Sequence, residues 1–369
     1  MNINFMRFID RVAGIPICYL LSKGRGEKRP LPNKVRTIAL IKMWGIGSIV
    51  LASPLMNAVR ESFPRARIIF VSMKSNQGLY DRNRMFDERL YIDTGNPLSF
   101  LLTTQRVIAY LKEQRIDLLL DLEPIARFTT IITALAGPKF SIGFETGEQS
   151  RISLYDATVP YRNDIHITDT FLQMADLLGL RHSKGLIRPS ITKKIKEKIN
   201  GLLDRPFIVI NPNVSQMVPE RKWPAENFSE LADHLMEKGR TVVLTGSHED
   251  TENADRVIRR MKHVPVNLTA KLSLSELGYL LQKADLLITN DSGPLHIAEA
   301  VGCRSVSFFG PESPTLYGPK NGKVFYKETD CSPCISINTA KRVRCKKNAR
   351  CIKEITLEEV TRCVDEMIR

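Results

Sequence analysis

Two successive runs of alternating strand and helix patterns dominate this sequence of 369 residues. In the first run, a β-branched stretch from Thr37 to Lys42 leads into a turn that carries Gly45 and Gly47, followed by a helix. The same order restarts at Pro206, after a linker. Strands that alternate with helices of this length form parallel sheets with helices on both faces. We therefore predict an α/β protein with two Rossmann-like, doubly wound domains.

Changes in composition predict four segments. An N-terminal amphipathic and basic segment occupies residues 1–33, and the two Rossmann-like domains occupy 34–185 and 186–330. A cysteine-rich, basic loop and a C-terminal helix follow over 331–369. Ligands of doubly wound sheets bind at the carboxyl ends of the strands, so two such domains facing each other would enclose a central cleft.

The N-terminal segment combines apolar side chains with arginines at helical spacing. A basic amphipathic helix of this kind either packs on the protein itself or lies on a membrane surface, and both interpretations stay open. The net charge of +14 favours an anionic partner. No stretch approaches the roughly 20 apolar residues that a membrane-spanning helix needs, and no secretory signal is expected. The apolar positions are Phe5, Met6, Phe8, Ile9, Val12 and Ile15.

The segment Ala284–Gly310 predicts a phosphate site. A buried strand leads into Asp291 and Ser292, which are helix N-cap types, and then into Gly293, which permits a tight turn. His296 follows in the first turn of the expected helix. The free amides and the positive dipole end of such a helix bind anions. An ordinary capped turn is the alternative, but four suitable residues at one helix start favour the phosphate site.

The run from Asn290 to His296, followed by Phe309-Gly310-Pro311, resembles the ADP-heptose:lipopolysaccharide heptosyltransferase family, glycosyltransferase family 9. The stretch Ile38–Pro54 looks like the first strand, glycine loop and helix of that family. Further segments resemble the family in the same order along most of the chain: Ile116–Gly143, Ile210–Asn213, Arg221–Pro224, Thr245–Glu249 and Cys331–Val360.

The resemblance implies a GT-B fold, with the acceptor on the first domain and the nucleotide sugar on the second. It implies inverting transfer of a heptose or related sugar, from ADP-heptose, to the inner core of lipopolysaccharide or another glycan, with no cofactor required for catalysis. With a lipid-linked acceptor, residues 5–21 and the basic loop near the C-terminus predict a cytoplasmic protein that is peripheral on the inner face of the cytoplasmic membrane. The implied donor-binding residues are Ser215, Arg221, Glu249, Asp291, Ser292, Gly293 and His296, and the acceptor-side loop holds Trp44, Gly45, Gly47 and Ser48.

One position departs from the family pattern. The family usually has an aspartate after the glycine loop as the general base, whereas this chain has Ser48. A serine hydroxyl cannot hold the acceptor's proton at neutral pH. Glu123, after the expected strand Ile116–Leu120, is the preferred substitute, and Asp121 is the second; Glu123 could instead only stabilise a helix dipole. The departure also leaves open a non-catalytic relative that binds nucleotide sugar or a lipid-linked glycan.

Four cysteines lie close together near the C-terminus. Four thiolates can close a tetrahedral zinc or iron site, and reduced thiols without metal are the alternative. Basic residues interleave with these cysteines and suit phosphorylated lipid or a membrane. No aromatic platform accompanies them, so we expect no nucleic acid as a partner. The candidate ligands are Cys331, Cys334, Cys345 and Cys351.

Overall fold

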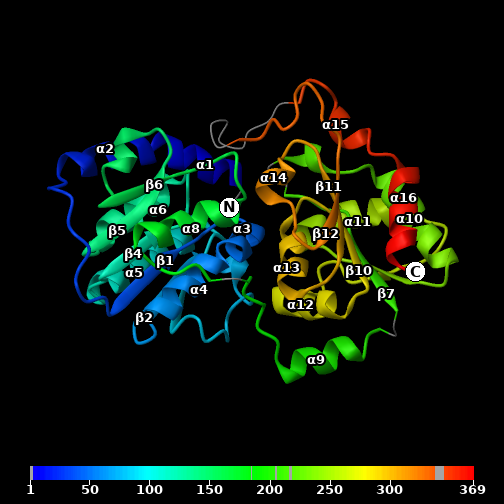
Figure 1. Ribbon diagram of the computed structural model, residues 1–369, viewed down its shortest axis with the longest axis horizontal. Helices are drawn as coiled ribbons and strands as arrows, with labels where there is room; N and C mark the ends of the chain where they lie inside the picture. The colour runs from blue at the N-terminus through cyan, green and yellow to red at the C-terminus, as the bar shows by residue number, and fades with distance from the viewer. Residues whose placement is uncertain (1–2, 184, 204–205, 216–217, 337–344) are drawn as a thin grey trace. The chain divides into compact units, whose positions relative to one another are not determined.

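The chain forms two parallel six-stranded sheets, one in each of two units (Figure 1). The computed structural model describes residues 3–183, 185–203, 206–215, 218–336 and 345–369. One unit comprises Met1–Gln77 with Asp81–Ile187, and the other comprises Gly78–Tyr80 with Arg188–Arg369. The predicted α/β class with two doubly wound sheets is confirmed.

The first sheet has the strand order β3-β2-β1-β4-β5-β6. The order places the first and fourth strands side by side, which is the switch point where doubly wound sheets bind ligands. The register pairs Leu40 of β1 with Leu120 of β4. The strands are β1 (Thr37–Ile41), β2 (Arg67–Met73), β3 (Glu88–Ile92), β4 (Leu118–Asp121), β5 (Phe140–Glu145) and β6 (Ala157–Pro160).

Helices cover both faces of the first sheet. Ala39 and Ile41 of β1 face a core that Val107, Leu111 and Ile132 complete from α5 and α6. On the other face, α4 packs against α8. The helices are α3 (Ile46–Leu51), α4 (Ser53–Ser62), α5 (Pro97–Glu113), α6 (Arg127–Ala136), α7 (Gln149–Ile152) and α8 (Ile167–Leu177), with the short η1 (Lys74–Asn76) after β2.

The N-terminal segment folds into α1 (Ile3–Val12) and α2 (Gly14–Lys23), which lie beside α6 (Figure 1). The Asp10 carboxylate accepts the backbone N–H of Phe128 at 2.7 Å, and that of Arg127, at the start of α6. Gly14 and Cys18 are buried, and a Cβ on Gly14 would come within 2.9 Å of the Arg127 side chain. One side of this segment therefore packs on the protein itself.

The second sheet repeats the topology of the first, with the order β12-β11-β10-β7-β8-β9. Its first and fourth strands, β7 and β10, are again neighbours, and Ile288 pairs with Ile210. The strands are β7 (Phe207–Asn211), β8 (Thr241–Leu244), β9 (Val266–Asn267), β10 (Leu286–Asn290), β11 (Ser305–Phe309) and β12 (Gly322–Tyr326).

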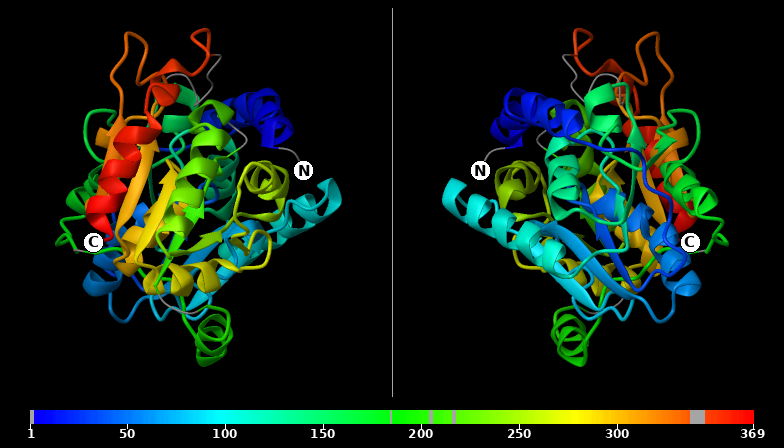
Figure 2. Two further views of the ribbon diagram at one scale, coloured as in Figure 1. Left: turned by 90° about the vertical axis from the view of Figure 1, so that its right-hand side faces the viewer. Right: turned by 90° about the vertical axis from the view of Figure 1, so that its left-hand side faces the viewer.

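A buried indole ties the C-terminal tail to the second unit. Trp223 is 1% exposed, stacks on Phe308 at a centroid distance of 4.3 Å, and donates from Nε1 to the Ile355 carbonyl at 2.8 Å. The C-terminal helix α16 then packs beside α10 over the same core (Figure 2). The helices are α9 (Lys193–Asn200), α10 (Ala225–Glu237), α11 (Thr251–Ile258), α12 (Leu274–Lys283), α13 (Gly293–Val301), α14 (Pro314–Tyr317), α15 (Arg350–Lys353) and α16 (Leu357–Met367), with η2 (Pro219–Arg221) and η3 (His248–Asp250).

None of the helices in the described ranges is both long enough and apolar enough to span a bilayer.

Candidate functional site

In the second unit, the turn after β10 ends in a helix start that no described side chain caps. Ser292 is the N-cap residue of α13, with φ −154°, and its hydroxyl lies 3.1 Å from the Thr289 hydroxyl instead of bonding the first helical amides. The first amides of a helix have no partners within the helix itself. The start of α13 therefore offers backbone donors and a positive dipole end to an anion.

Arg221 and Asp291 form a buried ion pair beside this helix start. The guanidinium Nη1 lies 2.9 Å from the Asp291 carboxylate, and the two side chains are 14% and 6% exposed. Trp223 fixes the arginine loop, because its backbone N–H donates to the Asn290 side chain at 2.8 Å. The pair thus joins the loop after β7 to the turn after β10.

Two buried nitrogens near this pair have no hydrogen-bond partner among the described residues: Arg221 Nε and His296 Nδ1. His296 is 3% exposed, and its Nδ1 lies 4.0 Å from a Glu299 carboxylate oxygen. Buried polar groups are nearly always satisfied, so unsatisfied nitrogens at an uncapped helix start need an explanation. An anionic ligand would supply an acceptor for Arg221 Nε, and for His296 Nδ1 when that nitrogen carries a proton.

Asparagines link the neighbouring strand ends. Asn213, after β7, donates to the Thr245 carbonyl at 3.0 Å, and Asn253 donates to the Asn213 side chain at 2.9 Å. A Cβ on Gly246, two residues after β8, would come within 2.7 Å of the Asn213 amide nitrogen and 2.9 Å of the Asp250 Cβ, so a side chain there would displace these residues. Asn213 was not predicted as a site residue; its position two residues after the buried strand β7 was the available signal.

Ser215 and Glu249 lie at the same edge of the sheet but outside the ion pair. Ser215 is exposed in the loop after β7, and Glu249 is exposed on η3, after β8. Their donor-binding roles stay predictions, as do those of Arg221, Asp291, Ser292, Gly293 and His296.

In the first unit, Glu123 anchors the acceptor-side loop. It is 5% exposed, and its Oε1 accepts Lys42 Nζ at 2.6 Å, the Met43 N–H at 2.8 Å and the Trp44 N–H at 2.9 Å. Lys42 was not predicted as a site residue, although a lysine at the end of a buried strand was a visible signal. A buried carboxylate thus joins β4 to the loop after β1.

The loop that Glu123 holds contains the other predicted acceptor-side residues. Gly45 adopts φ +81°, a conformation that L side chains rarely adopt, and Gly47 is buried in α3. Ser48 is half-buried in the same helix. The Trp44 ring lies edge-on to Phe128 at 6.2 Å and is only partly buried.

Asp121 lies behind Glu123 and has no exposed surface. It accepts the Tyr155 hydroxyl at 2.6 Å and the Glu123 backbone N–H at 3.0 Å. Burial raises the pKa of Asp121 to about 6, although Arg151 opposes the shift. Burial also raises the pKa of Tyr155 well above its ordinary value. Of the two candidate bases, Glu123 is therefore the more accessible.

The structure does not support a metal site at the four C-terminal cysteines. Among the described residues, which include all four, no three Cys, His, Asp or Glu side chains are placed to bind a metal ion. Burial, and then the neighbouring thiols of Cys351, Cys331 and Cys345, raise the pKa of Cys334 to about 11. The thiols are therefore near one another, but Cys331 is exposed and Cys345 accepts the Ala349 N–H instead.

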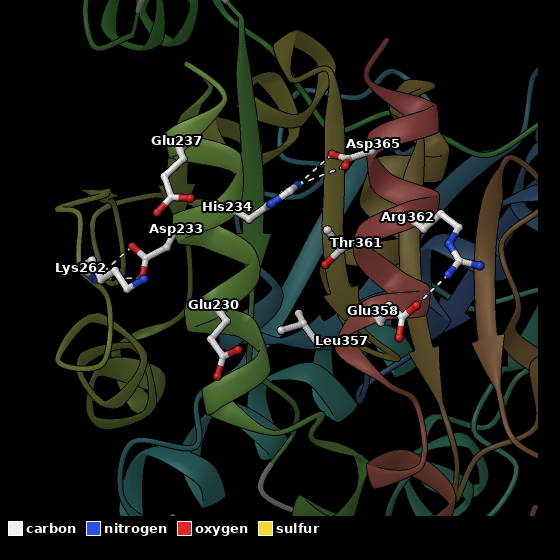
Figure 3. A pocket seen from close by; sticks show the side chains of 10 residues that line it. All are labelled: Glu230, Asp233, His234, Glu237, Lys262, Leu357, Glu358, Thr361, Arg362 and Asp365. Atoms are coloured by element: carbon white, nitrogen blue, oxygen red, sulfur yellow. Dashed lines mark hydrogen bonds and ion pairs between the residues drawn. The ribbon is translucent and has the colours of Figure 1, made fainter.

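A separate surface pocket lies between α10 and α16 and is not formed by strand ends (Figure 3). Most of its charged side chains have partners within the second unit. His234 contacts Asp365 at 3.0 Å, Arg362 contacts Glu358 at 2.8 Å, and Asp233 accepts the Lys262 N–H. We therefore interpret this pocket as a surface groove between two packed helices and not as the functional site.

The family model described as glycosyltransferase family 9 (heptosyltransferase) matches residues 104–343, more than half of the chain. The chain belongs to glycosyltransferase family 9. It is a glycosyltransferase, and the predicted family is confirmed.

Known proteins and solved structures match this family 9 enzyme along most of its length. The lipopolysaccharide core heptosyltransferase OpsX of Haemophilus influenzae is 21% identical over 292 residues, covering 78% of this chain and 82% of that protein. A family 9 glycosyltransferase structure from Veillonella parvula matches with a TM-score of 0.76 and 22% identity over 92% of this chain and 99% of its own. The structure of the E. coli ADP-heptose lipopolysaccharide heptosyltransferase II matches with a TM-score of 0.73 and 19% identity, over 90% of this chain and 98% of its own. The family 9 enzyme has the GT-B fold.

The raised pKa of Asp121 predicts an unusual pH dependence of stability. The folded protein holds a proton on Asp121 up to about pH 6, whereas the unfolded chain releases it near 3.8. The stabilisation is complete below the lower value and is lost as the pH rises through about 6. We expect the unfolding free energy of wild type, relative to that of the non-titrating variant Asp121→Asn, to fall by about 2–3 kcal/mol from pH 4 to pH 7. Urea unfolding of both proteins across this range measures it, and a relative stability of wild type that stays constant or rises with pH would contradict the assignment.

Proposed function

We propose that this enzyme moves a heptose from ADP-heptose to the inner core of lipopolysaccharide, with inversion at the anomeric carbon. One observation supports the proposed donor site. The Arg221–Asp291 pair lies beside the uncapped start of α13, where the buried Arg221 Nε and His296 Nδ1 have no hydrogen-bond partner among the described residues. The names of the relatives from Haemophilus influenzae and E. coli supply the sugar and the acceptor class.

The donor diphosphate would bind at the start of α13. Its oxygens would accept hydrogen bonds from the Ser292 and Gly293 amides and from Arg221. Asp291 would hold the guanidinium in place, while His296 in the first turn would add a donor. When the bond between the anomeric carbon and the diphosphate breaks, these same groups would stabilise the negative charge on the departing ADP.

The acceptor hydroxyl would lose its proton to Glu123. The hydroxyl oxygen attacks the anomeric carbon, the bond to the diphosphate breaks, and ADP leaves with the electron pair. Ser48 cannot accept the released proton, whereas a carboxylate can. Glu123 is held at the edge of the acceptor loop by Lys42 and two backbone amides. Asp121, fully buried behind it, is the second candidate.

A lipid-borne acceptor would place the enzyme at the inner face of the cytoplasmic membrane, as a peripheral protein. The basic loop after Cys334, predicted as a further membrane contact, includes residues 337–344, which lie outside the described residues.

A donor panel tests the proposed function. Purified enzyme would be incubated with ADP-heptose, other nucleotide heptoses and nucleotide hexoses, each with and without heptose-deficient lipopolysaccharide core. We expect ADP release only with ADP-heptose, dependent on the core, with inverted stereochemistry in the product. Transfer from another donor with none from ADP-heptose, or no consumption of any donor, would contradict the proposal.

Glu123→Gln tests the base. Glutamine retains an acceptor for the Met43 and Trp44 amides but cannot take up the proton. We expect a loss of about 10²–10⁴ in kcat, with unchanged ADP affinity because Glu123 belongs to the first unit.

Two matched variants distinguish the alternatives to Glu123. If Glu123→Gln retains turnover while Asp121→Asn loses it, Asp121 is the base. If Glu123→Gln is inactive and Ser48→Asp restores activity to it, a base at the position after the glycine loop is sufficient.

A further inference from the structure

The helix α2 presents its apolar side to solvent. Its inward face consists of the small residues Gly14 and Cys18, both buried. Its outward side chains are large and apolar, and no charged residue lies between Val12 and Lys23. A surface helix of a water-soluble protein normally shows the opposite arrangement. The outward residues are Ile15 (42% exposed), Ile17 (40%), Tyr19 (52%) and Leu20 (67%).

The preceding helix, α1, continues this surface. Its inward face is fixed by Met6, which packs against the core under α6, and by Asp10, which caps α6. Four large apolar side chains remain outside: Phe5 (49% exposed), Phe8 (59%), Ile9 (40%) and Val12 (57%).

The first turns of α5 add a third set of exposed leucines. Leu98, Leu101 and Leu102 are 65%, 53% and 42% exposed. Phe100, between them, contacts Phe128 at the start of α6 with a ring distance of 5.0 Å, and Met6 of α1 packs against the same core cluster. The start of α5 and α1 therefore both adjoin the start of α6. We call the exposed apolar side chains of α1, α2 and the first turns of α5 the apolar face.

The basic residues around the apolar face indicate which kind of partner covers it. Residues 1–36 contain eight lysines and arginines but only two acidic residues. Arg11 and Lys23 are exposed near the ends of α1 and α2, and Arg106 is exposed one turn beyond Leu102. Protein interfaces are depleted of lysine, whereas helices that lie in a bilayer surface combine aromatic and aliphatic side chains with a basic rim. Anionic headgroups attract such a rim.

We infer that the apolar face inserts into the headgroup region of an anionic bilayer and holds the acceptor-side loop beside the membrane. Phe128, at the start of α6, also contacts Trp44 of that loop, with ring centroids 6.2 Å apart. A glycan acceptor carried on lipid would then reach Trp44 and Glu123 without leaving the bilayer. The inference rests on the proposed function for the identity of the acceptor, but the docking itself does not depend on it.

Vesicle flotation tests the docking. Full-length wild type is mixed with vesicles of phosphatidylethanolamine and phosphatidylglycerol, or of phosphatidylcholine alone. We expect flotation with the anionic vesicles, reduced by added salt, and at least tenfold weaker binding to the neutral ones. The double variant Phe8→Asp/Leu20→Asp should bind anionic vesicles at least tenfold more weakly than wild type. Val264→Asp alters an 87% exposed apolar residue of the second unit and should bind like wild type.

Two further measurements distinguish membrane docking from a dimer interface and from the proposed transferase function. The double variant should keep the wild-type melting temperature and wild-type transfer to a water-soluble, deacylated core acceptor, while losing transfer to lipid-embedded core. Unchanged flotation of the double variant, or no flotation of wild type, overturns the inference. So does a wild-type dimer that the double variant dissociates without any vesicle binding, because a second copy would then cover the face. Absence of transfer to either acceptor, with flotation intact, would overturn the proposed function alone.

Discussion

The constraint on which the rest depends is the strand order shared by both sheets, which places the first and fourth strands side by side. Connections leave the two strands in opposite directions, so the carboxyl ends of both stay open at the switch point. In each unit a cation that follows the first strand pairs there with a carboxylate that follows the fourth. Lys42 pairs with Glu123 in one unit, and Arg221 pairs with Asp291 in the other. Burying a charge pair costs desolvation free energy that the attraction only partly returns, so stability alone does not explain why both units retain one.

The two pairs differ in what remains unsatisfied around them. Glu123 accepts Lys42 and two backbone amides on a single oxygen, so it holds the Trp44 loop in one conformation. The Arg221 pair lies next to an uncapped helix start, with Arg221 Nε and His296 Nδ1 lacking acceptors among the described residues. The first arrangement suits a positioned proton acceptor, and the second suits an anion that arrives and departs. This asymmetry matches a division between acceptor side and donor side.

Local patterns in the sequence predicted most of the strands and helices, but neither of the two buried ion pairs. The apolar runs Pro206–Ile210 and Ala284–Thr289 predict the buried strands β7 and β10 to within two residues of their ends, because continuous apolar runs mark strands covered on both faces. The edge strands β6, β9 and β12 were missed, since their residues are largely half-exposed and form no such run. Helix α5 begins at Pro97, four residues before the start at Leu101 that the apolar pattern predicts, because the Asn96 side chain accepts the Ser99 N–H and caps the helix. Lys42 and Glu123 lie 81 residues apart, and Arg221 and Asp291 lie 70 apart, so no local pattern could reveal either pair.

The most direct test of the donor-side assignment is calorimetric titration of Arg221→Ala with ADP and with adenosine. If the guanidinium binds the diphosphate, ADP binding should weaken by about 1.5–3 kcal/mol, the loss expected for a charge-assisted hydrogen bond. Adenosine affinity should be unchanged, because adenosine carries no phosphate. Arg256→Ala is the matched control, since Arg256 is paired with Glu252 on the surface of α11, and it should bind both ligands like wild type. Wild-type ADP affinity in Arg221→Ala, or an equal loss for adenosine, would contradict a diphosphate site at the start of α13.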